Sequence, residues 1–521
     1  MRCAATGLFL VVWAGTMAAH AQIPNFSKFK HVVVIVQENR TPDNLFNGLN
    51  PKCGSQLTIH CYDIATSGLA LVKGKDITVP LKTIELANDY DLSHAHSAFE
   101  LMCDPDATGA CKMDGANLIP DTCAKKAKDC HHKGKGEFLS YKYVDNSTGT
   151  VQPYLDLATQ YAWANRMFQT NQGPSYPAHQ FIFGGTSAPS AADDAAGTFV
   201  AENPGGAAPG TKANSNTGCL APLNETNNVV STNTGACPTG CTCYNNNTVK
   251  ECPLVNNPLG AFCYDRDTLP SKLNAATTWK YYAPEVTTNP GGANPEGSLW
   301  TAPASIKPLC GPNSTFTACT GAAFTGPNRN VVLHPRQVLT DISNCELASV
   351  SWVIPRGQES DHPNDNNGSG PSWVASIVNA IGNSPACPTI NETYWLDTAI
   401  LITWDDWGGW YDHVPPNILA GDEGTYQLGF RVPLLVVSAY TPQGLINNAP
   451  HDFGSILRMI EGIFNGPKGE GALDFADKRA NNDLRNFFTL TEPRTFQTIK
   501  APTKADFFIN DTTPATAPDD D

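Results

Sequence analysis

The chain has 521 residues, of which 41% are hydrophobic and only 16% charged, and its formal net charge is -15 at pH 7. This length fits one large α/β domain with insertions, or two domains, and the apolar fraction is sufficient for a sizeable core. The acidic balance and the lack of a basic block argue against a nucleic-acid partner. An acidic protein still binds phosphate where a metal or local donors reverse the sign inside the site.

The first residues have the pattern of a secretory signal. Arg2 supplies a positive charge, residues 8–13 form a short apolar run, and the Ala-His-Ala sequence at 19–21 fits the small-x-small cleavage rule. We therefore expect a signal peptide over 1–21 and a secreted or periplasmic protein. No stretch reaches the ~18 uninterrupted apolar residues of a membrane helix, so we expect no transmembrane segment.

Cysteine usage agrees with export. Of the 17 cysteines, Cys3 is removed with the signal, which leaves an even number that predicts disulfides throughout, several of them inside 219–319. Four cysteines crowd one segment: Cys237, Cys241, Cys243 and Cys252. Their spacing is also compatible with a zinc thiolate cluster, although an oxidising compartment favours disulfides.

Four β-branched runs without clean alternation predict strands that are covered on both faces. They are residues 31–36, 347–354, 398–404 and 432–438. Apolar residues at helical spacing predict helices over 371–383 and 452–466. Strands that alternate with helices indicate an α/β fold with a mostly parallel central sheet.

Composition changes along the chain suggest its organisation. The main domain is predicted over 22–500. Within it, residues from about 190 to 335 are rich in Asn, Gly, Thr, Pro and Cys, which predicts a Cys-rich, disulfide-stapled insertion and a candidate lid over a site. The polar tail over 501–521 is predicted to be disordered.

Polar side chains follow three of the predicted strands. Glu38-Asn39 follows the first strand, Asp405-Asp406 follows the run at 398–404, and Asp361-His362 lies in the loop after 347–354. Ligands of open parallel sheets bind beyond the carboxyl ends of the strands. One such ending is typical of a solvated turn, but three together favour a site, and carboxylate and amide oxygens suit a divalent cation.

Ser175 lies between Gly-Pro and Tyr-Pro, in a turn that can hold a hydroxyl at a helix N-terminus. Free N–H groups and the helix dipole favour anions there. The local sequence alone is explained more simply by a turn or N-cap serine. His94 and His413 lie in two further polar segments, "NDYDLSHAHSAFE" and "DDWGGWYDHVPP".

Taken in order, several segments resemble the bacterial phospholipase C/acid phosphatase family of phosphoesterases. They are "ENRTPDNLF", "DLSHAH", "GPSYPAHQFIFGGTS", "SWVIPRGQESDHP", "LITWDDWGGWYDHVPP", "GFRVPLLVVSAYTPQGLI" and "DFGSILRMIEGIFN". The resemblance spans roughly 30–465 with a gap at about 190–335. It implies an alkaline-phosphatase-like three-layer α/β sandwich and a secreted, metal-dependent phosphoric-ester hydrolase.

The resemblance also implies residue roles. Ser175 matches the nucleophile, His94 and His362 match phosphate-site histidines, and His413 is a site or supporting histidine. The implied ligands of a divalent metal cation are Glu38, Asn39, Ser175, Asp405 and Asp406. Two positions depart from the family pattern, because Asp406 stands where Glu is usual and Ala178 where Asn is usual.

The implied route is attack by Ser175 and hydrolysis of a phosphoserine by water, with an acidic optimum if His94 and His362 act protonated. The chain ends without the C-terminal extension of the larger phospholipases, which favours an acid phosphatase, with phospholipid head groups still among the expected substrates. Two alternatives stay open. One is a secreted binding module with an inactive site. The other is a sulfatase-like hydrolase, although the Cys/Ser-x-Pro-x-Arg segment of sulfatases is missing at Ser175.

Overall fold

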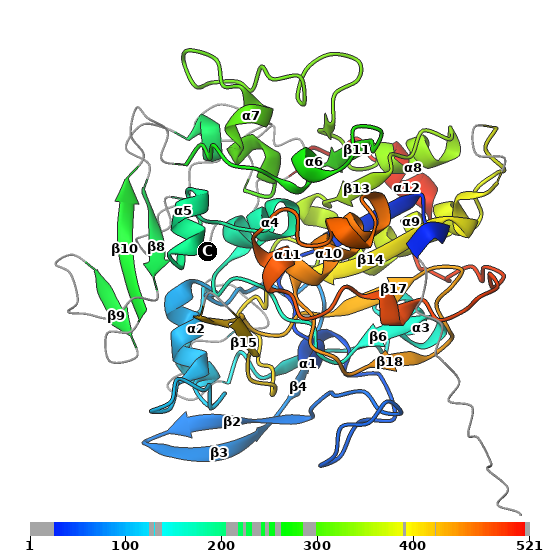
Figure 1. Ribbon diagram of the computed structural model, residues 1–521. Helices are drawn as coiled ribbons and strands as arrows, with labels where there is room; N and C mark the ends of the chain where they lie inside the picture. Colours follow the sequence, from blue (N-terminus) through cyan, green and yellow to red (C-terminus); the bar gives the residue numbers. More distant parts are fainter. Residues whose placement is uncertain are drawn as a thin grey trace, which may run out of the picture.

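The computed structural model in Figure 1 describes residues 26–515. Short gaps lie at 124–129, 131–137, 205–216, 222–225, 232–240, 245–248, 256–261, 285–298, 389–391 and 422–423. The predicted signal peptide at 1–21 lies outside the described residues. No helix within the described part of the chain has the length and apolar character needed to cross a membrane.

An eight-stranded sheet in the order β12-β11-β13-β1-β14-β17-β6-β18 forms the centre of the molecule. Its four middle strands are the predicted ones: β13 (Val350–Val353), β1 (His31–Gln37), β14 (Thr398–Trp404) and β17 (Leu434–Val437). All residues of these strands are buried, as expected for strands that are covered on both faces. The predicted mostly parallel sheet is confirmed, with β17 running antiparallel to both of its neighbours.

The outer strands of this sheet escaped the sequence analysis because runs of two to four residues show no usable periodicity. They are β6 (Ala162–Ala164), β11 (Trp279–Tyr282), β12 (Val331–Val332) and β18 (Leu445–Asn447). Since β11 and β12 come from the segment predicted as an insertion, part of 190–335 belongs to the central sheet. The predicted boundary of the insertion therefore needs this correction.

Helices cover both faces of the sheet. Val34 of β1 pairs with Trp352 of β13 on one side and with Leu401 of β14 on the other, so Trp352 and Leu401 point to the same face of the sheet. On that face Trp352 packs on Phe183, with ring centroids 5.1 Å apart. Trp404 lies three residues beyond Leu401 and therefore points to the opposite face, where it packs on Tyr154 at 5.1 Å. Phe183 belongs to α4 (Ser175–Gly184) and Tyr154 to α3 (Gln152–Gln160), so these helices lie in the two outer layers of a three-layer α/β sandwich.

The two predicted helices correspond to α9 (Gly370–Gly382) and α10 (Phe453–Phe464). The other helices are α1 (Pro42–Leu45), α2 (His96–Cys103), α3 (Gln152–Gln160), α4 (Ser175–Gly184), α5 (Ala191–Ala195), α6 (Leu269–Lys272), α7 (Lys307–Cys310), α8 (Gln337–Ser343), α11 (Ala476–Arg479) and α12 (Ala505–Asn510). The remaining strands form small sheets, β2 (Ser67–Val72) with β3 (Lys75–Pro80), β4 (Lys82–Ile84) with β5 (Lys142–Val144), and β15 (Ile418–Gly421) with β16 (Gly424–Gln427).

A separate four-stranded sheet, β7-β8-β10-β9, stands at one side of the molecule (Figure 1). Its strands are β7 (Thr198–Val200), β8 (Thr226–Ser231), β9 (Thr242–Tyr244) and β10 (Val249–Val255). Disulfides staple this Cys-rich region at Cys219–Cys263, Cys241–Cys252 and Cys310–Cys319. The predicted bridges inside 219–319 are therefore confirmed.

Further disulfides lie elsewhere in the described chain: Cys53–Cys61, Cys103–Cys111, Cys123–Cys130 and Cys345–Cys387. Cys243 is disulfide-bonded as well, like Cys241 and Cys252. These three sulfurs are not available as thiolates, so the zinc interpretation is wrong for them, and Cys237 lies outside the described residues.

The C-terminal tail is ordered up to Ala515, so the prediction of disorder over 501–521 is wrong for this part. Residues 505–510 form α12, and Phe508 packs on Trp373 of α9 with ring centroids 5.4 Å apart. Phe508 is the buried residue of this helix and anchors the tail, whereas its neighbours Phe507 and Ile509 are exposed. Residues 516–521 lie outside the described part of the chain.

Candidate active site

The ends of β1 and β14 bring the first two predicted ligands together. The strand pairing continues past both ends, because the Asp405 N–H donates to the Gln37 carbonyl at 3.0 Å. The Asn39 N–H then donates to Asp405 Oδ1 at 3.0 Å. Asp405 lies four residues after Leu401, on the face that α4 covers, and Glu38 is its neighbour across the pair. Register alone therefore points both carboxylates at α4.

Two glycines allow the loop after β14 to lie against Asn39. Gly408 has φ +59°, and a Cβ there would lie 2.4 Å from the Asn39 carbonyl oxygen. Gly409 has φ +71°, and its Cβ would lie 2.4 Å from Leu92 Cβ. Only glycine combines this backbone with so close an approach. The Gly408 N–H also donates to Asp406 Oδ1 at 2.7 Å, which fixes the orientation of that carboxylate.

Ser175 is the first residue of α4, and its hydroxyl lies among the predicted metal ligands. Its Oγ is 3.2 Å from Asp406 Oδ2, 3.4 Å from Asn39 Oδ1 and 3.5 Å from Glu38 Oε2. The side chain is 1% exposed. The structure thus brings all five predicted ligand residues into one buried cluster, although Ser175 is not the helix N-cap, which is Pro174.

His94 and His362 lie beside this cluster, with ring centroids 6.2 Å apart. His94 Nδ1 donates to the Leu92 carbonyl at 2.9 Å, which leaves Nε2 as the acceptor for the Asn39 side-chain amide at 3.3 Å. This bond turns Asn39 Oδ1 toward Ser175. His362 Nδ1 donates to the Pro363 carbonyl at 2.7 Å. Both imidazoles are buried, and His94 Nε2 is 3.9 Å from Asp406 Oδ2.

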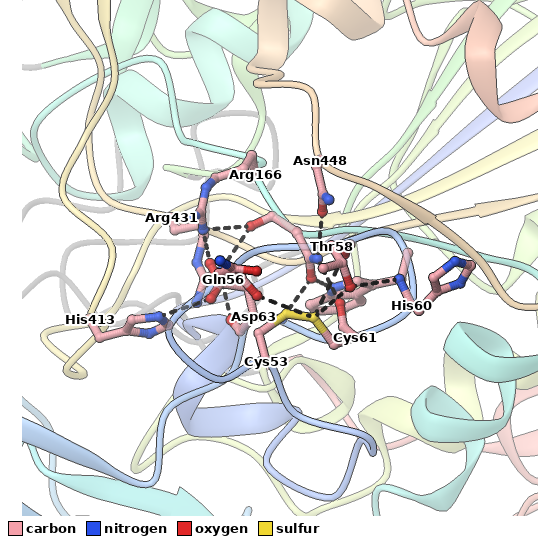
Figure 2. Close-up of a disulfide and its surroundings, with 12 residues drawn as sticks. Cys53, Gln56, Thr58, His60, Cys61, Asp63, Arg166, His413, Arg431 and Asn448 are labelled. Carbon is pink, nitrogen blue, oxygen red and sulfur yellow. Dashed lines mark hydrogen bonds and ion pairs between the residues drawn. A yellow bond between two sulfur atoms is a disulfide. The ribbon is translucent and has the colours of Figure 1, made fainter.

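His413 lies in a different cluster, so the structure does not bring it to Ser175 by any contact among the described residues. Figure 2 shows its ring beside Asp63 and Arg431, near the Cys53–Cys61 disulfide. Its Nδ1 is 2.8 Å from Asp43 Oδ2 and its Nε2 is 3.2 Å from Asp63 Oδ1.

The buried Arg431 donates to Asp412 in the same cluster, at 3.0 and 2.9 Å. It also lies 3.4 Å from Asp43. Asp43 belongs to α1, which follows β1, and Asp412 and His413 follow β14. The cluster therefore ties the two ligand-bearing loops together, which is a supporting arrangement.

Arg40 explains why a guanidinium follows Glu38-Asn39. It is fully buried and donates to the Asp361 carbonyl at 2.8 Å, the Leu86 carbonyl at 2.9 Å and Asn88 Oδ1 at 3.1 Å. It also lies over the Trp410 ring at 5.1 Å. Burial lowers the pKa of Arg40 to about 10. The side chain anchors the loop through backbone carbonyls and an amide.

Sequence reasoning missed His179. It lies on α4 four residues after Ser175, and its Nε2 is 3.2 Å from Glu38 Oε1 and 3.9 Å from Asp405 Oδ2. The ring is fully buried and stacks on Trp300, which comes from the segment predicted as an insertion. The i, i+4 spacing from Ser175 was the available signal, because residues so spaced share a helix face.

The cluster concentrates negative charge in a buried volume. Burial raises the pKa of Glu38 and Asp406 well above the usual carboxyl range, and repulsion from Asp405 raises both further. Burial also acts on Asp405, but the nearby His179 and hydrogen bonds hold its pKa below the ordinary value. Asp405 Oδ2 is buried and has no hydrogen-bond donor among the described residues. Such a set of hard oxygen donors fits a divalent cation, which Glu38, Asn39, Ser175, Asp405 and Asp406 would hold.

Comparison with known proteins identifies the family of the chain. The model of the Phosphoesterase family matches residues 29–467. The chain belongs to this family. The match covers both site-forming strands and α4, so the predicted family is confirmed.

The chain is similar in sequence to phospholipases C. It is 34% identical over 147 residues to the non-hemolytic phospholipase C of Burkholderia pseudomallei, an alignment of 24% of this chain and 20% of that protein. It is 29% identical over 154 residues to phospholipase C B of Mycobacterium tuberculosis, covering 26% of this chain and 28% of that protein. The alignments thus span about a quarter of the length of these relatives. The solved structure of a Vibrio parahaemolyticus protein in the alkaline phosphatase superfamily aligns with 68% of this chain and with 66% of its own chain. The sequence identity is 10% and the TM-score is 0.29.

Proposed function

We propose that this phosphoesterase-family protein is a secreted, metal-dependent phosphoric-ester hydrolase that acts through Ser175 and a phosphoseryl intermediate. The observation that carries the proposal is the position of the Ser175 hydroxyl. It stands at the N-terminus of α4, within 3.5 Å of oxygens from Glu38, Asn39 and Asp406. Membership of the family, the similarity to phospholipases C and the described disulfides support the same class of secreted hydrolase.

A divalent cation bound by this cluster would supply Lewis acidity, which lowers the pKa of a bound hydroxyl and offsets charge on the phosphoryl group. Ser175 Oγ attacks phosphorus, the new Oγ–P bond forms, and the bond to the leaving alkoxide breaks. Asp406 Oδ2 is the closest of the three oxygens at 3.2 Å, and in its ionised form Asp406 would take the hydroxyl proton. The dipole of α4 favours the phosphoryl oxygens at this helix end.

His94 and His362 have the positions needed to act on the phosphoryl group. Their rings lie together beside the cluster, and Nδ1 of each is fixed by a backbone carbonyl. A fixed Nδ1–H directs Nε2 of each ring toward the site. In the protonated form either imidazole donates to a phosphoryl oxygen or gives a proton to the leaving alkoxide, so an acidic optimum follows. Water then attacks phosphorus and gives one proton to the imidazole that protonated the alkoxide, and Ser175 Oγ regains its proton from Asp406 as the Oγ–P bond breaks.

The class of ester is the finer part of the proposal. The relatives are phospholipases C, so phospholipid head groups are candidate substrates beside simple phosphomonoesters. The choice between acid phosphatase and phospholipase C is decided by turnover of p-nitrophenyl phosphate and p-nitrophenyl phosphorylcholine, measured side by side with and without a chelator. Hydrolysis of at least one substrate, lost with chelator and restored by metal, is expected. Chelator-resistant hydrolysis would contradict the metal dependence.

The same assay separates the two alternatives. A binding module with an inactive site predicts no turnover of either ester, yet this chain retains the nucleophile and every proposed ligand. A sulfatase-like hydrolase predicts preference for p-nitrophenyl sulfate over the phosphate ester. We expect the sulfate to be turned over far more slowly, because the sequence around Ser175 lacks the sulfatase segment.

A further inference from the structure

A cavity of about 200 Å³ lies where the C-terminal tail folds back on the chain, and none of its lining residues belongs to the candidate active site. α12 lies beside α8 and α9 (Figure 1), and residues 512–515 complete this wall. The other walls come from the residues before α8, from α9 and from the loop that carries His362. The tail lies beyond residues 29–467, which match the family model, so the cavity is a feature of this chain that the proposed chemistry does not use.

One part of the cavity wall is apolar. Trp373 of α9 and Phe508 of α12 pack edge to face, with ring centroids 5.4 Å apart, and both side chains are buried. Pro335, Pro514 and Ala515 also line the space. An apolar cavity of about 150 Å³ is large enough to bind benzene. The cavity here is larger, so it has room for a body of the size of a benzene ring together with one small polar group.

The acidic groups beside the cavity already have their hydrogen-bond donors. Both carboxylate oxygens of Glu359 accept from the Arg356 guanidinium. Asp511, which precedes the lining residues of the tail, accepts from Arg356 at Oδ2 and from the Thr513 N–H at Oδ1. Each of these four oxygens is therefore matched within the protein, and neither carboxylate needs a donor from a ligand.

Arg336 is a lining residue whose donors are not all used in this way. Its Nη1 donates to the Asp511 carbonyl, and its guanidinium forms no ion pair with a carboxylate in the part of the chain that the structure describes. An arginine side chain stays protonated and holds its N–H donors in a planar fork, which fits the two oxygens of a carboxylate. A half-buried fork beside an apolar wall therefore favours a ligand that is both anionic and apolar.

We propose that this cavity binds a small carboxylic acid in its anionic form, with an apolar body of about the size of a benzene ring. The carboxylate pairs with Arg336, and the apolar body packs against Trp373 and Phe508. Because the walls join the tail to the loop of His362, a bound acid contacts both and holds them together. The site is separate from the proposed hydrolase, in which the anion is a phosphoryl group.

The test measures binding of 4-fluorobenzoate to the full chain by fluorine NMR of the probe. Excess inorganic phosphate is present throughout, because it competes for the proposed active site. We expect a dissociation constant of about 1 mM or tighter, which is reasonable for a ligand of this size. The neutral analogue 4-fluorobenzyl alcohol keeps the ring but has no charge, so it should bind at least about tenfold more weakly.

Variants of the cavity wall assign the binding site. Arg336→Gln should weaken binding of 4-fluorobenzoate at least about tenfold and leave that of the alcohol unchanged, because only the ion pair is lost. The matched control is Arg329→Gln, at an exposed arginine outside the cavity, and it should bind both probes like the wild type. Ala515 is buried in the wall, so Ala515→Phe fills part of the space and should weaken binding of both probes.

Several results would overturn the proposal. They are no binding of 4-fluorobenzoate to the wild-type chain, displacement of the probe by inorganic phosphate, and equal affinities of Arg336→Gln and Arg329→Gln. A chain truncated after Ala515 is measured as well. Binding only after this truncation would show that residues 516–521 fill the cavity, which overturns a site for a free acid. All of these readouts are binding measurements, so they decide the point whether or not the protein hydrolyses phosphoric esters.

Discussion

Asn39 shows how one side chain serves two parts of the site. Its amide nitrogen faces His94 Nε2 at 3.3 Å, and its oxygen faces Ser175 Oγ at 3.4 Å. Its backbone N–H donates to Asp405 Oδ1 at 3.0 Å. The residue therefore links His94, the Ser175 hydroxyl and Asp405, which explains why an amide rather than a fourth acid follows Glu38 here.

Asp406→Asn should weaken metal binding and turnover while the fold is kept. The substitution removes a charge but preserves the shape, and the Gly408 N–H still has an oxygen to meet. We expect a loss of metal affinity of at least tenfold, on the scale of altered metal-site ligands. Titration of the chelator-treated protein with Mn²⁺ measures it. Affinity equal to that of the wild type would remove Asp406 from the ligand set.

Gly408→Ala should disturb Asn39 rather than only the local backbone. The left-handed φ costs about 1–2 kcal/mol for a residue with a Cβ, and the new methyl would also meet the Asn39 carbonyl oxygen at 2.4 Å. Gly74→Ala is the matched control, because Gly74 has φ +73° but no heavy atom within 4 Å of its Cβ. Chemical denaturation and turnover together test the difference. The Gly74 variant should lose stability but keep its turnover, whereas the Gly408 variant should lose both stability and turnover. Equal turnover in the two variants would contradict a role of Gly408 in positioning Asn39.

At the scale of elements, α2 meets the side sheet through buried acids. Glu100 of α2 and Glu202 each lie near Glu251 of β10, and His96 Nε2 is 3.7 Å from Glu100 Oε1. Burial, together with repulsion from Glu251, raises the pKa of Glu100 from 4.5 to about 7. Burial lowers the pKa of His96, so the ring does not offset the acids at neutral pH.

This junction predicts how stability depends on pH. The folded state holds the Glu100 proton more tightly than the unfolded state, so its contribution is complete below about pH 4.5 and is lost as pH rises through about 7. Glu100→Gln stays neutral, and its melting temperature should therefore fall less than that of the wild type between pH 5 and about 8. Glu85→Gln, at an exposed position, is the control and should follow the wild type. Parallel curves for wild type and Glu100→Gln would contradict the assignment.

At the scale of the whole molecule, the C-terminal tail closes back on the loop that carries His362. Arg356 donates to the Thr513 carbonyl at 2.6 Å and also pairs with Asp511. Gln358 donates to the Pro514 carbonyl at 2.8 Å. A cavity of about 200 Å³ lies between this tail and the loop, next to Trp373. The tail therefore supports a loop that is distant from it in the sequence.

Truncation after Lys504 should lower stability and turnover together. The loss of Phe508 from its contact with Trp373 should cost about 3 kcal/mol or more, in the range of large core truncations. Truncation after Ala515 removes only residues beyond the described tail and serves as the control. Turnover and thermal unfolding of the two truncations decide the point. A shorter chain with unchanged stability and turnover would show that the tail has no supporting role.

The sequence predicted those parts of the fold that long, regular patterns define. The buried runs at 31–36 and 398–404 became β1 and β14 almost residue for residue, because a two-sided strand needs an unbroken apolar run. The strand ends then gave Glu38 and Asp405, since register fixes which side chains meet.

Other features depend on contacts that no local pattern contains. His179 lies inside an apolar helix and gains meaning only from Glu38, which is 141 positions away. His413 was grouped with the site because it follows the paired acids, but Asp43 and Asp63 hold it elsewhere. The tail at 505–515 is short, and its apolar run of three residues is surrounded by polar residues and proline, which is the composition that predicts disorder.

The central claim is that Ser175 carries the phosphoryl group, and trapping that adduct tests it most directly. The wild-type enzyme is mixed with p-nitrophenyl phosphate, quenched in acid during turnover, and digested for mass spectrometry, beside Ser175→Ala. We predict phosphate on the peptide that contains Ser175. The Ala variant should show no adduct, an intact fold and turnover reduced by several orders of magnitude, as for hydrolases that lose their nucleophile. Phosphate on another residue, or near-wild-type turnover in the Ala variant, would contradict the account.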